Sequence, residues 1–551
     1  MTFQISFHPA ARGNTVTMLL KFLTTVEPKI KKVLLDFVAI IGLFLVSTGS
    51  TPRKAPQRPN IIFIMADDMG YSDIGCYGGE IHTPNIDQLA ANGIKLRNFY
   101  NNARCCPTRA SLLTGQYPHT VGIGHMVTQA FAKIQPGHYQ GFLDDKYPTI
   151  AEELKKTGYN TYMAGKWHVG ERPEHWPLKR GFEHYFGLIS GASSYYEIIP
   201  AEIGKRFMVQ DDKEITLPAE GFYMTDAFTD HAIQYLDHQK IEDPNKPFFL
   251  YLAYTAPHFP IHAYESDVAK YENLYKQGWD VTREKRYQKM IKLGLTDSRY
   301  HLTPRPNDIP AWVSVSDKKT WVRKMAVYAA MIDRMDQNIG KLMDALKANN
   351  QFDHTMIVFI SDNGGCAENV ANRNLNDTNT IIGERGSYLT YDTPWANVSN
   401  TPFKKYKRYL HEGGIVTPCI IHYPAKIKPL GGFMDDIGHV IDLLPTSLEL
   451  AGETSKTFPG ESLSYLWNGK NSPSRTYCWE HEGNQAIRQG SWKLVKDMED
   501  TDWELYNLKS DPCETKNVAA ASLKQVERLR KVYNVWSQRV GVRPVTNVIA
   551  E

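Results

Sequence analysis

The stretch Asn60-Ile61-Ile62-Phe63-Ile64-Met65-Ala66-Asp67-Asp68 decides the fold of this chain. Its apolar run does not alternate and stops at two aspartates, which is typical of a strand buried on both faces of a parallel sheet. Two other runs have the same form: residues 248–254 end before Ala256-Pro257-His258, and residues 355–360 end at Ser361-Asp362-Asn363. Each strand therefore delivers polar side chains at its carboxyl end, where open α/β sheets assemble their sites.

Helical patterns lie between and after these strands, at residues 85–92, 150–157, 225–237, 321–348 and 437–450. The alternation of strands and helices predicts an α/β fold with a mostly parallel central sheet sandwiched by helices. A polar stretch at residues 264–317 has the composition of an insertion on this large domain.

The pattern changes from about Ser472 onward. Short segments such as residues 486–495 precede a helical pattern at residues 522–536. We therefore expect a large domain, which carries the site at the strand ends, over residues 60–471 and a smaller C-terminal α+β domain over residues 472–551. A length of 551 residues fits this division, because it is too great for one ordinary core.

The composition describes a globular protein, with 42% hydrophobic and 22% charged residues. The net charge of +3 is nearly neutral for this length and gives no support for nucleic-acid binding, which requires a basic patch or stripe. A local basic cluster at residues 404–408 is still available for an anionic substrate.

The N-terminal fifty residues have the order of a secretory signal. Lys31-Lys32 precede an apolar run at residues 33–46, and small residues follow at 47–50. The run is short for a membrane span, which needs about 20 apolar residues. We therefore expect residues 1–50 to be a signal peptide or N-terminal hydrophobic segment and residues 51–59 to be a linker. The predicted location is periplasmic or secreted, with an uncleaved membrane anchor as the competing interpretation.

Oxygen-bearing side chains follow two strands that can be neighbours in the sheet. Asp67 and Asp68 end the first strand, and Asp362 and Asn363 end the other. Calcium and magnesium prefer oxygen ligands, and packed carboxylates without a cation raise one another's pKa values. The set therefore predicts a divalent metal site, calcium or magnesium, although turns and helix caps also favour Asp and Asn. No spacing of cysteine and histidine indicates a zinc site.

The segment Cys105-Cys106-Pro107-Thr108-Arg109, continued by Leu113-Thr114-Gly115, resembles the signature of type I sulfatases. In that family the first cysteine is oxidised after translation to formylglycine. The family usually has Ser or Ala where this chain has Thr108. The alternative interpretation is a buried cysteine pair in a loop that enters a helix at Pro107. Conversion of Cys105 would leave six of the seven cysteines, and adjacent Cys105 and Cys106 make a poor disulfide.

Further motifs support the resemblance over about residues 59–495. They are Gly165-Lys166-Trp167-His168, Ala256-Pro257-His258-Phe259-Pro260, and Lys407 five residues before Glu412-Gly413-Gly414. The segments 79–85, 395–403 and 411–414 are most similar to bacterial arylsulfatases. The resemblance implies an alkaline-phosphatase-like core, a calcium ion, a formylglycine derived from Cys105, and a maturation enzyme that makes it.

The resemblance also implies roles for individual residues. Lys166, His258 and Lys407 would contact the sulfate or the leaving oxygen, and Arg109 and His168 would hold the formylglycine hydrate. The metal ligands would be Asp67, Asp68, residue 105, Asp362 and Asn363. One hydroxyl of the hydrate would attack sulfur, His258 or Lys407 would protonate the departing oxygen, and His168 would be the base for the release of sulfate.

Two other functions remain open from the sequence. A phosphonate or phosphodiester hydrolase of the same superfamily needs the same metal, cationic clamp and nucleophile. A glycan-binding protein whose Cys105 is never matured would not be an enzyme at all. The substrate is not readable, because sulfated small molecules and sulfated glycans present the same group.

Overall fold

The computed structural model describes residues 58–127, 137–200, 205–428, 432–469, 472 and 474–544, together with the isolated Glu27. Almost all of the predicted signal segment (1–50), and the linker up to residue 57, lie outside this part of the chain. Within it, no helix combines the length and the apolar character that crossing a bilayer requires.

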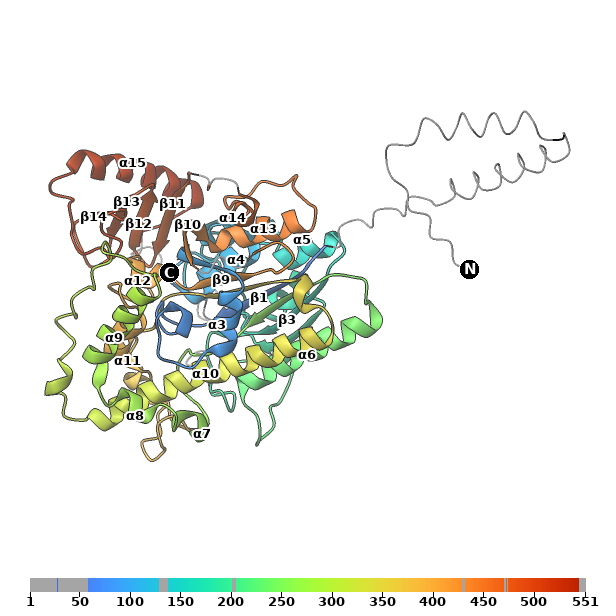
Figure 1. Cartoon of the computed structure of the whole chain (residues 1–551), viewed down its shortest axis with the longest axis horizontal. Coiled ribbons are helices and arrows are strands. Elements are labelled where there is room, and N and C mark those ends of the chain that lie inside the picture. The colour runs from blue at the N-terminus through green and yellow to red at the C-terminus, as the bar shows by residue number, and fades with distance from the viewer. Residues whose placement is uncertain are drawn as a thin grey trace. The chain divides into compact units, whose positions relative to one another are not determined.

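A ten-stranded, mostly parallel sheet forms the centre of the main body, in the order β10-β2-β9-β8-β1-β7-β3-β4-β5-β6 (Figure 1). The three strands expected from the sequence lie side by side in its middle: β1 Asn60–Ala66 pairs in parallel with β7 Phe248–Ala253 on one side and with β8 Thr355–Ser361 on the other. The remaining strands are β2 Ile94–Tyr100, β3 Asn160–Gly165, β4 His184–Leu188, β5 Met208–Gln210, β6 Lys213–Glu214, β9 Cys419–His422 and β10 Phe433–His439.

Helices cover both faces of this sheet. Alternate residues of β1 belong to different cores: Ile62 and Ile64 pack with one set of helices, whereas Ile61 and Phe63 pack with another. The first core includes α3 Pro84–Ala91, α6 Met224–Glu242 and α10 Lys318–Ala348, and the second includes α4 Cys105–Thr114, α5 Ile150–Lys156 and α13 Leu443–Leu450. The predicted helix-sandwiched α/β fold is confirmed, and β1 is buried on both faces as expected.

The segment 264–317 folds into short helices rather than an unstructured loop. It contains α7 Glu265–Val268, α8 Glu272–Tyr275 and α9 Gly278–Lys292. Arg286 of α9 is fully buried and pairs with Asp73, at 2.6 Å, and with Glu80, at 2.7 Å. The segment is therefore anchored in the large body by a buried guanidinium. Other helices are α11 Asp392–Ser399, α12 Glu412–Ile415 and α14 Tyr465–Asn468.

The helix predicted for residues 437–450 is wrong in its first half. Strand β10 occupies Phe433–His439 and pairs in parallel with β2 at the edge of the sheet, and a short 3-10 turn, Val440–Asp442, precedes α13. The backbone N–H of Ile441 donates to His439 Nδ1, and the N–H of His439 donates to Asp442 Oδ2 at 2.8 Å. These two side-chain hydrogen bonds end the strand and begin the helical turn. The periodicity of apolar residues in the sequence gives no information about this boundary.

The C-terminal part is a smaller α+β unit, as predicted. Four antiparallel strands, β11 Thr476–His481, β12 Asn484–Gln489, β13 Trp492–Lys496 and β14 Glu504–Asn507, pack against α15 Leu523–Val540. The sheet contacts the large body through Trp479, whose Nε1 donates to the Asn101 carbonyl at 2.9 Å. Lys493 is buried between Glu412 and Glu514, at 2.6 and 2.9 Å. The boundary at residue 472 stays a prediction.

Candidate active site

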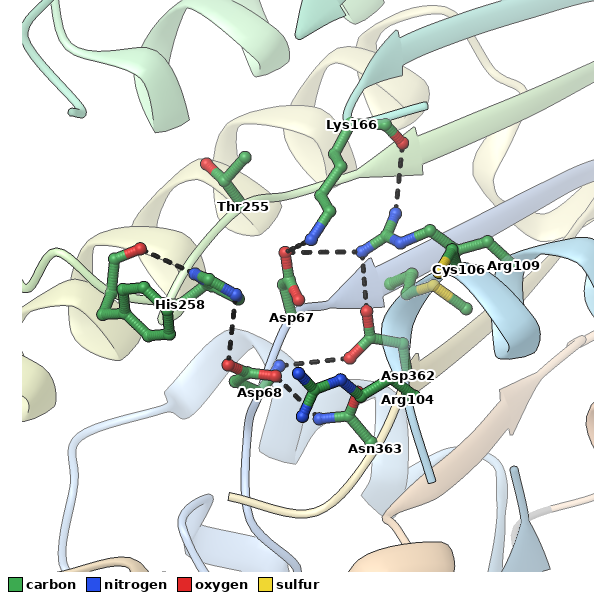
Figure 2. A network of polar contacts seen from close by, with 12 residues as sticks. Asp67, Asp68, Arg104, Cys106, Arg109, Lys166, Thr255, His258, Asp362 and Asn363 are labelled. Carbon is green, nitrogen blue, oxygen red and sulfur yellow. Dashed lines mark hydrogen bonds and ion pairs between the residues drawn. The ribbon is translucent and has the colours of Figure 1, made fainter. Parts of the chain in front are cut away.

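The carboxyl ends of β1 and β8 bring four oxygen-bearing side chains together (Figure 2). Because the two strands are parallel neighbours, Asp67 and Asp68 meet Asp362 and Asn363 at the same edge of the sheet. The backbone N–H of Asp68 donates to Asp362 Oδ1 at 3.1 Å, and Asn363 Nδ2 donates to Asp68 Oδ1 at 2.7 Å. Asp68 has φ of 66°, so the chain turns sharply here and directs both aspartates inward.

Helix α4 brings the cysteine motif to this edge. It begins at Cys105, so Pro107 lies in its first turn. The backbone nitrogens of a first turn have no acceptor within the helix, so the missing N–H of proline costs nothing there. The Thr108 hydroxyl accepts from the Asn102 backbone N–H at 3.0 Å and so fixes the loop that enters the helix. Arg109, one turn along, reaches the β8 end and donates to Asp362 Oδ2 at 2.8 Å.

Two buried cations cross-link the strand ends. Lys166 follows β3, and its Nζ lies 2.6 Å from Asp67 Oδ2. Arg109 donates to the Lys166 carbonyl at 3.1 Å and to the Tyr251 hydroxyl at 3.3 Å. Glycine is required at residue 165, because its φ is 119° and a Cβ there would lie 1.9 Å from the Ala253 carbonyl oxygen. The close approach of β3 to β7 thus places Lys166 over Asp67.

His258 and Lys407 approach Asp68 from the opposite side. Lys407 Nζ donates to Asp68 Oδ2 at 2.8 Å and lies 3.3 Å from His258 Nε2. His258 Nδ1 lies 2.6 Å from the Phe259 carbonyl, which can only accept, so we assign the proton to Nδ1 and a lone pair to Nε2. Burial lowers the pKa of His258 to about 3, which agrees with a neutral ring.

Of the basic cluster 404–408, all of it within the described residues, only Lys407 lines the cavity described below. Lys404 pairs with Glu504, Lys405 with Asp497 and Arg408 with Glu482. The cluster therefore supplies one cation to an anionic ligand, and its other charges connect the large body to the C-terminal strands.

His168 lies next to the cysteine pair. Its φ is 58°, and its ring packs so closely on Gly191 that a Cβ there would come within 2.6 Å of the ring. One of its ring nitrogens lies within 4.8 Å of the sulfurs of Cys105 and Cys106. Nδ1 is buried and has no hydrogen-bond partner in the structure, so it can take up a proton.

Cys105 is in a cation-rich environment. The hydrogen bond with Cys106 and the Lys166 charge lower the pKa of the Cys105 thiol well below its ordinary value, although burial opposes this. Burial also opposes ionisation of Asp68, but the Lys407 ammonium lowers the pKa of that carboxyl to about 2. The site therefore favours negative charge at residue 105 and at Asp68. All seven cysteines, which all lie in the described ranges, are free thiols.

The four oxygen-bearing residues fit a divalent cation. Asp67 Oδ1 and Asn363 Oδ1 are buried and have no hydrogen-bond partner. Burial and the adjacent Asp362 raise the pKa of Asp67 well above its ordinary value, even with Lys166 and Arg109 nearby. A bound dication would satisfy both orphan oxygens and remove this repulsion. Ligand atoms of Asp67, Asp68 and His258 lie within 4.8 Å of one another, which adds His258 to the candidates.

A cavity of about 250 Å³ opens above these residues. Its inner end is formed by Cys105, His168, His258 and Lys407. Its outer part includes six charged residues that we did not predict: Arg104, Glu171, Lys205, Arg206, Glu368 and Arg373. Only Arg104 had a signal in the sequence, because it adjoins Cys105. The others come from loops that no spacing or motif marks. The structure thus brings every predicted site residue into one centre.

Comparison with known proteins identifies the class. A family model described as Sulfatase matches residues 59–453, and one described as N-sulphoglucosamine sulphohydrolase, C-terminal, matches residues 403–534. The chain is 33% identical to an uncharacterized sulfatase of Schizosaccharomyces pombe, over 88% of this chain and 94% of the relative. It is 34% identical to the arylsulfatase of Klebsiella aerogenes, over 74% and 90%. The protein is therefore a sulfuric ester hydrolase. It belongs to the sulfatase family.

Solved structures with the same fold include two that are useful for comparison. Ps i-CgsB has a TM-score of 0.66 and 28% identity, with 87% of this chain and 93% of that chain covered. Another structure, solved in complex with its substrate D-glucosamine-2-N,6-O-disulfate, has a TM-score of 0.59 and 25% identity, with 88% and 98% covered.

Proposed function

We propose that this sulfatase works through a formylglycine made from Cys105. The observation that supports it most is the position of Cys105: it is the first residue of α4, 1% exposed, and it lines the inner end of the cavity with His168, His258 and Lys407. As a hydrated formylglycine, residue 105 would supply two geminal oxygens, one to attack sulfur and one to expel sulfate as the aldehyde re-forms. A plain serine or cysteine ester has no such exit.

We further propose that Asp67, Asp68, Asp362 and Asn363 hold calcium. Their orphan oxygens and mutual repulsion support a hard dication, and magnesium is the alternative. When bound, such an ion would act as a Lewis acid on the sulfate and the attacking hydroxyl. Arg109 helps to hold the proposed metal ligands in place, because its hydrogen bond to Asp362 orients that carboxylate. Because Arg109 and residue 105 belong to the same helix, α4, this bond also positions residue 105 relative to Asp362.

We assign Lys407 as the proton donor to the leaving oxygen. His258 presents a lone pair at Nε2, so in this arrangement the ring accepts a hydrogen bond and orients the Lys407 ammonium. Lys166 stabilises charge on the sulfate oxygens from the opposite side of Asp67. His168 Nδ1, buried and without a partner, takes the proton of the second hydroxyl at residue 105 when sulfate leaves.

The substrate class that we propose is a sulfated sugar. Relatives whose names state a substrate support it: the chain is 29% identical to the N-acetylglucosamine-6-O-sulfatase of Bacteroides thetaiotaomicron over 87% of its length. Ps i-CgsB has been solved with k-i-k-neocarrahexaose bound. A cavity of about 250 Å³ suits one sugar ring better than a long chain segment.

We propose a secreted or periplasmic location, because residues 31–50 have the order of a signal. Fractionation of cells and determination of the mature N-terminus test this. A chain that begins at residue 1 in the cytosol would contradict it.

Mass spectrometry of the peptide that contains residue 105 tests the proposed nucleophile. We expect protein co-expressed with a maturation enzyme to show a loss of about 18 Da relative to the unmodified cysteine, as the oxidation of a thiol to an aldehyde requires. The fraction of protein converted should be proportional to sulfatase activity. Full activity in protein whose Cys105 is entirely unmodified would refute the proposal.

A further inference from the structure

Cys106 has no role in the proposed reaction, although it adjoins the residue that we propose as the nucleophile. Its thiol is fully buried, and a disulfide with Cys105 is disfavoured because adjacent cysteines rarely reach the required geometry. Before maturation, the start of α4 therefore carries two neighbouring free thiols. Thiolates together with imidazole are the ligands that zinc prefers in proteins.

A histidine completes a set of three donors. One ring nitrogen of His168 and the sulfurs of Cys105 and Cys106 all lie within 4.8 Å of one another. In a tetrahedral zinc site with Zn–S bonds of about 2.3 Å, two sulfurs lie about 3.8 Å apart, so the donors need to approach one another by at most about 1 Å. Spacing along the chain does not reveal this set, because only the fold brings His168, which follows β3, to the cysteine pair.

The surrounding structure fixes the donors. The backbone N–H of Val127 donates to Cys106 Sγ at 3.3 Å, a hydrogen bond that favours a thiolate. His168 is 2% exposed, its ring packs against Gly191, and its Nδ1 has no hydrogen-bond partner. Cys105 and His168 also line the cavity, so a water molecule can reach a metal there as the fourth ligand.

The charge of such a complex suits its surroundings. Zinc displaces the protons of both thiols, so the two thiolates and the dication form a neutral group. The ammonium groups of Lys166 and Lys407 both act on Cys105 through their charge. Each of them is already paired, with Asp67 and Asp68 respectively, so a neutral complex does not disturb them.

We propose that the unmatured chain binds zinc through Cys105 Sγ, Cys106 Sγ and a ring nitrogen of His168, with a water molecule as the fourth ligand. The site differs from the oxygen site proposed for calcium, because its donors are sulfur and nitrogen. Bound zinc would shield the Cys105 thiol from the oxidation that makes formylglycine. Maturation would in turn abolish the site, since formylglycine has no sulfur; this last point rests on the proposed function, whereas zinc binding by the thiol form does not.

Calorimetry on protein expressed without a maturation enzyme tests the proposal, in buffer saturated with calcium so that the oxygen site is filled. We expect one zinc ion per chain to bind with release of protons. Cys105→Ser, Cys106→Ser and His168→Gln should each weaken zinc binding by about tenfold or more, because even the loss of an outer-shell partner costs about 10–100-fold. Cys76→Ser, which changes a half-buried cysteine outside the cavity, is the control and should leave the Kd unchanged. An equal Kd for the wild-type chain and all four variants overturns the proposal.

X-ray absorption at the zinc edge gives a test that does not depend on how the variants fold. In the unmatured wild-type chain we expect two sulfur neighbours at about 2.3 Å and nitrogen or oxygen neighbours at about 2.0–2.1 Å. A first shell without sulfur overturns the proposal, because the zinc then lies on other ligands. Protein whose residue 105 has been converted, as shown by mass spectrometry, should lose the two-sulfur shell.

The two measurements separate this inference from the proposed function. If the unmatured chain shows the two-sulfur shell but residue 105 is never converted, the zinc site stands and the proposed nucleophile fails. If residue 105 is converted but the unmatured chain shows no sulfur around zinc, the proposed nucleophile stands and the zinc site fails.

Discussion

Replacement of Lys166 by methionine tests both the buried charge network and the metal site. The Lys166 side chain is fully buried, and its Nζ lies 2.6 Å from Asp67 Oδ2. Methionine keeps most of the packing volume but removes the nearest cation of Asp67. The guanidinium of Arg109, at 3.6 Å, is then the cation that still pairs with this carboxylate. Removing one partner of a buried ion pair typically costs about 3–5 kcal/mol, because the other charge is left uncompensated.

We therefore expect Lys166→Met to lower the free energy of unfolding by about 3–5 kcal/mol in calcium-free buffer. Calcium should reduce this loss, because a dication beside Asp67 replaces the missing positive charge, and the variant should bind calcium more tightly than the wild type. The catalytic loss is separate: removal of one group that stabilises charge in the transition state costs about 10²–10³ in kcat.

The assay is denaturant unfolding of wild type, Lys166→Met and the exposed control Lys213→Met, each with a chelator and with saturating calcium. Asp67→Asn and the double variant complete a mutant cycle that isolates the pair. A loss below about 1 kcal/mol in the chelator would refute the argument for a buried ion pair. A loss of the same size with and without calcium would remove Asp67 from the proposed metal site.

Three further predictions concern the metal and the C-terminal unit. Removal of the divalent cation by a chelator should lower the melting temperature and abolish activity, and calcium should restore both more completely than zinc; equal restoration by zinc would contradict an all-oxygen site. Lys493→Met should destabilise the protein by about 3–5 kcal/mol, because it leaves Glu412 and Glu514 buried without their shared cation; a loss within about 0.5 kcal/mol would be inconsistent with this. His411→Gln should cost about 2 kcal/mol near pH 6, since Glu514, Asp497 and Glu504 together outweigh burial and raise the pKa of His411 above 6.5. The stabilisation of the fold by protonated His411 is complete below pH 6.5 and is lost as the pH rises through the raised pKa. The difference in free energy of unfolding between variant and wild type, measured by urea denaturation, should therefore shrink at alkaline pH; a difference that grows would contradict this.

The central strands were predictable because their burial determines which residue types they contain. A strand covered on both faces must be apolar throughout, and residues 60–66, 248–253 and 355–361 meet this condition. The polar residues that follow them then converge because parallel strands share one carboxyl edge. The set of oxygen-bearing residues that we propose to bind the metal was therefore accessible from residue type and position alone.

The edge of the sheet was harder to predict for a physical reason. Strand β10 is only partly buried, so its residues carry both apolar and acidic side chains, and Asp435 and Asp436 lie in its middle. This mixed pattern is close to that of an amphipathic helix. The hydrogen bonds of His439 and Asp442 decide the boundary, and they depend on geometry that appears only in the folded chain.

The charged residues in the outer part of the cavity could not be predicted from spacing. Arg206 and Glu171 follow different strands, and Arg373 belongs to a loop that follows β8. Loops bring such residues together only after the sheet has formed, and isolated charged residues in loops are ordinarily solvated. The proposed reacting centre was accessible because its residues lie in motifs, whereas the other charged residues of the cavity are dispersed along the chain.

The most direct test of the central claim is the release of sulfate by purified Cys105→Ser under steady-state conditions. The account predicts a folded protein with an unchanged calcium requirement for stability. It predicts at most one alcohol released per molecule and no free sulfate, because the serine sulfate ester that forms cannot expel sulfate. Continuous turnover at a rate comparable with the matured wild-type enzyme would show that residue 105 does not supply the nucleophile.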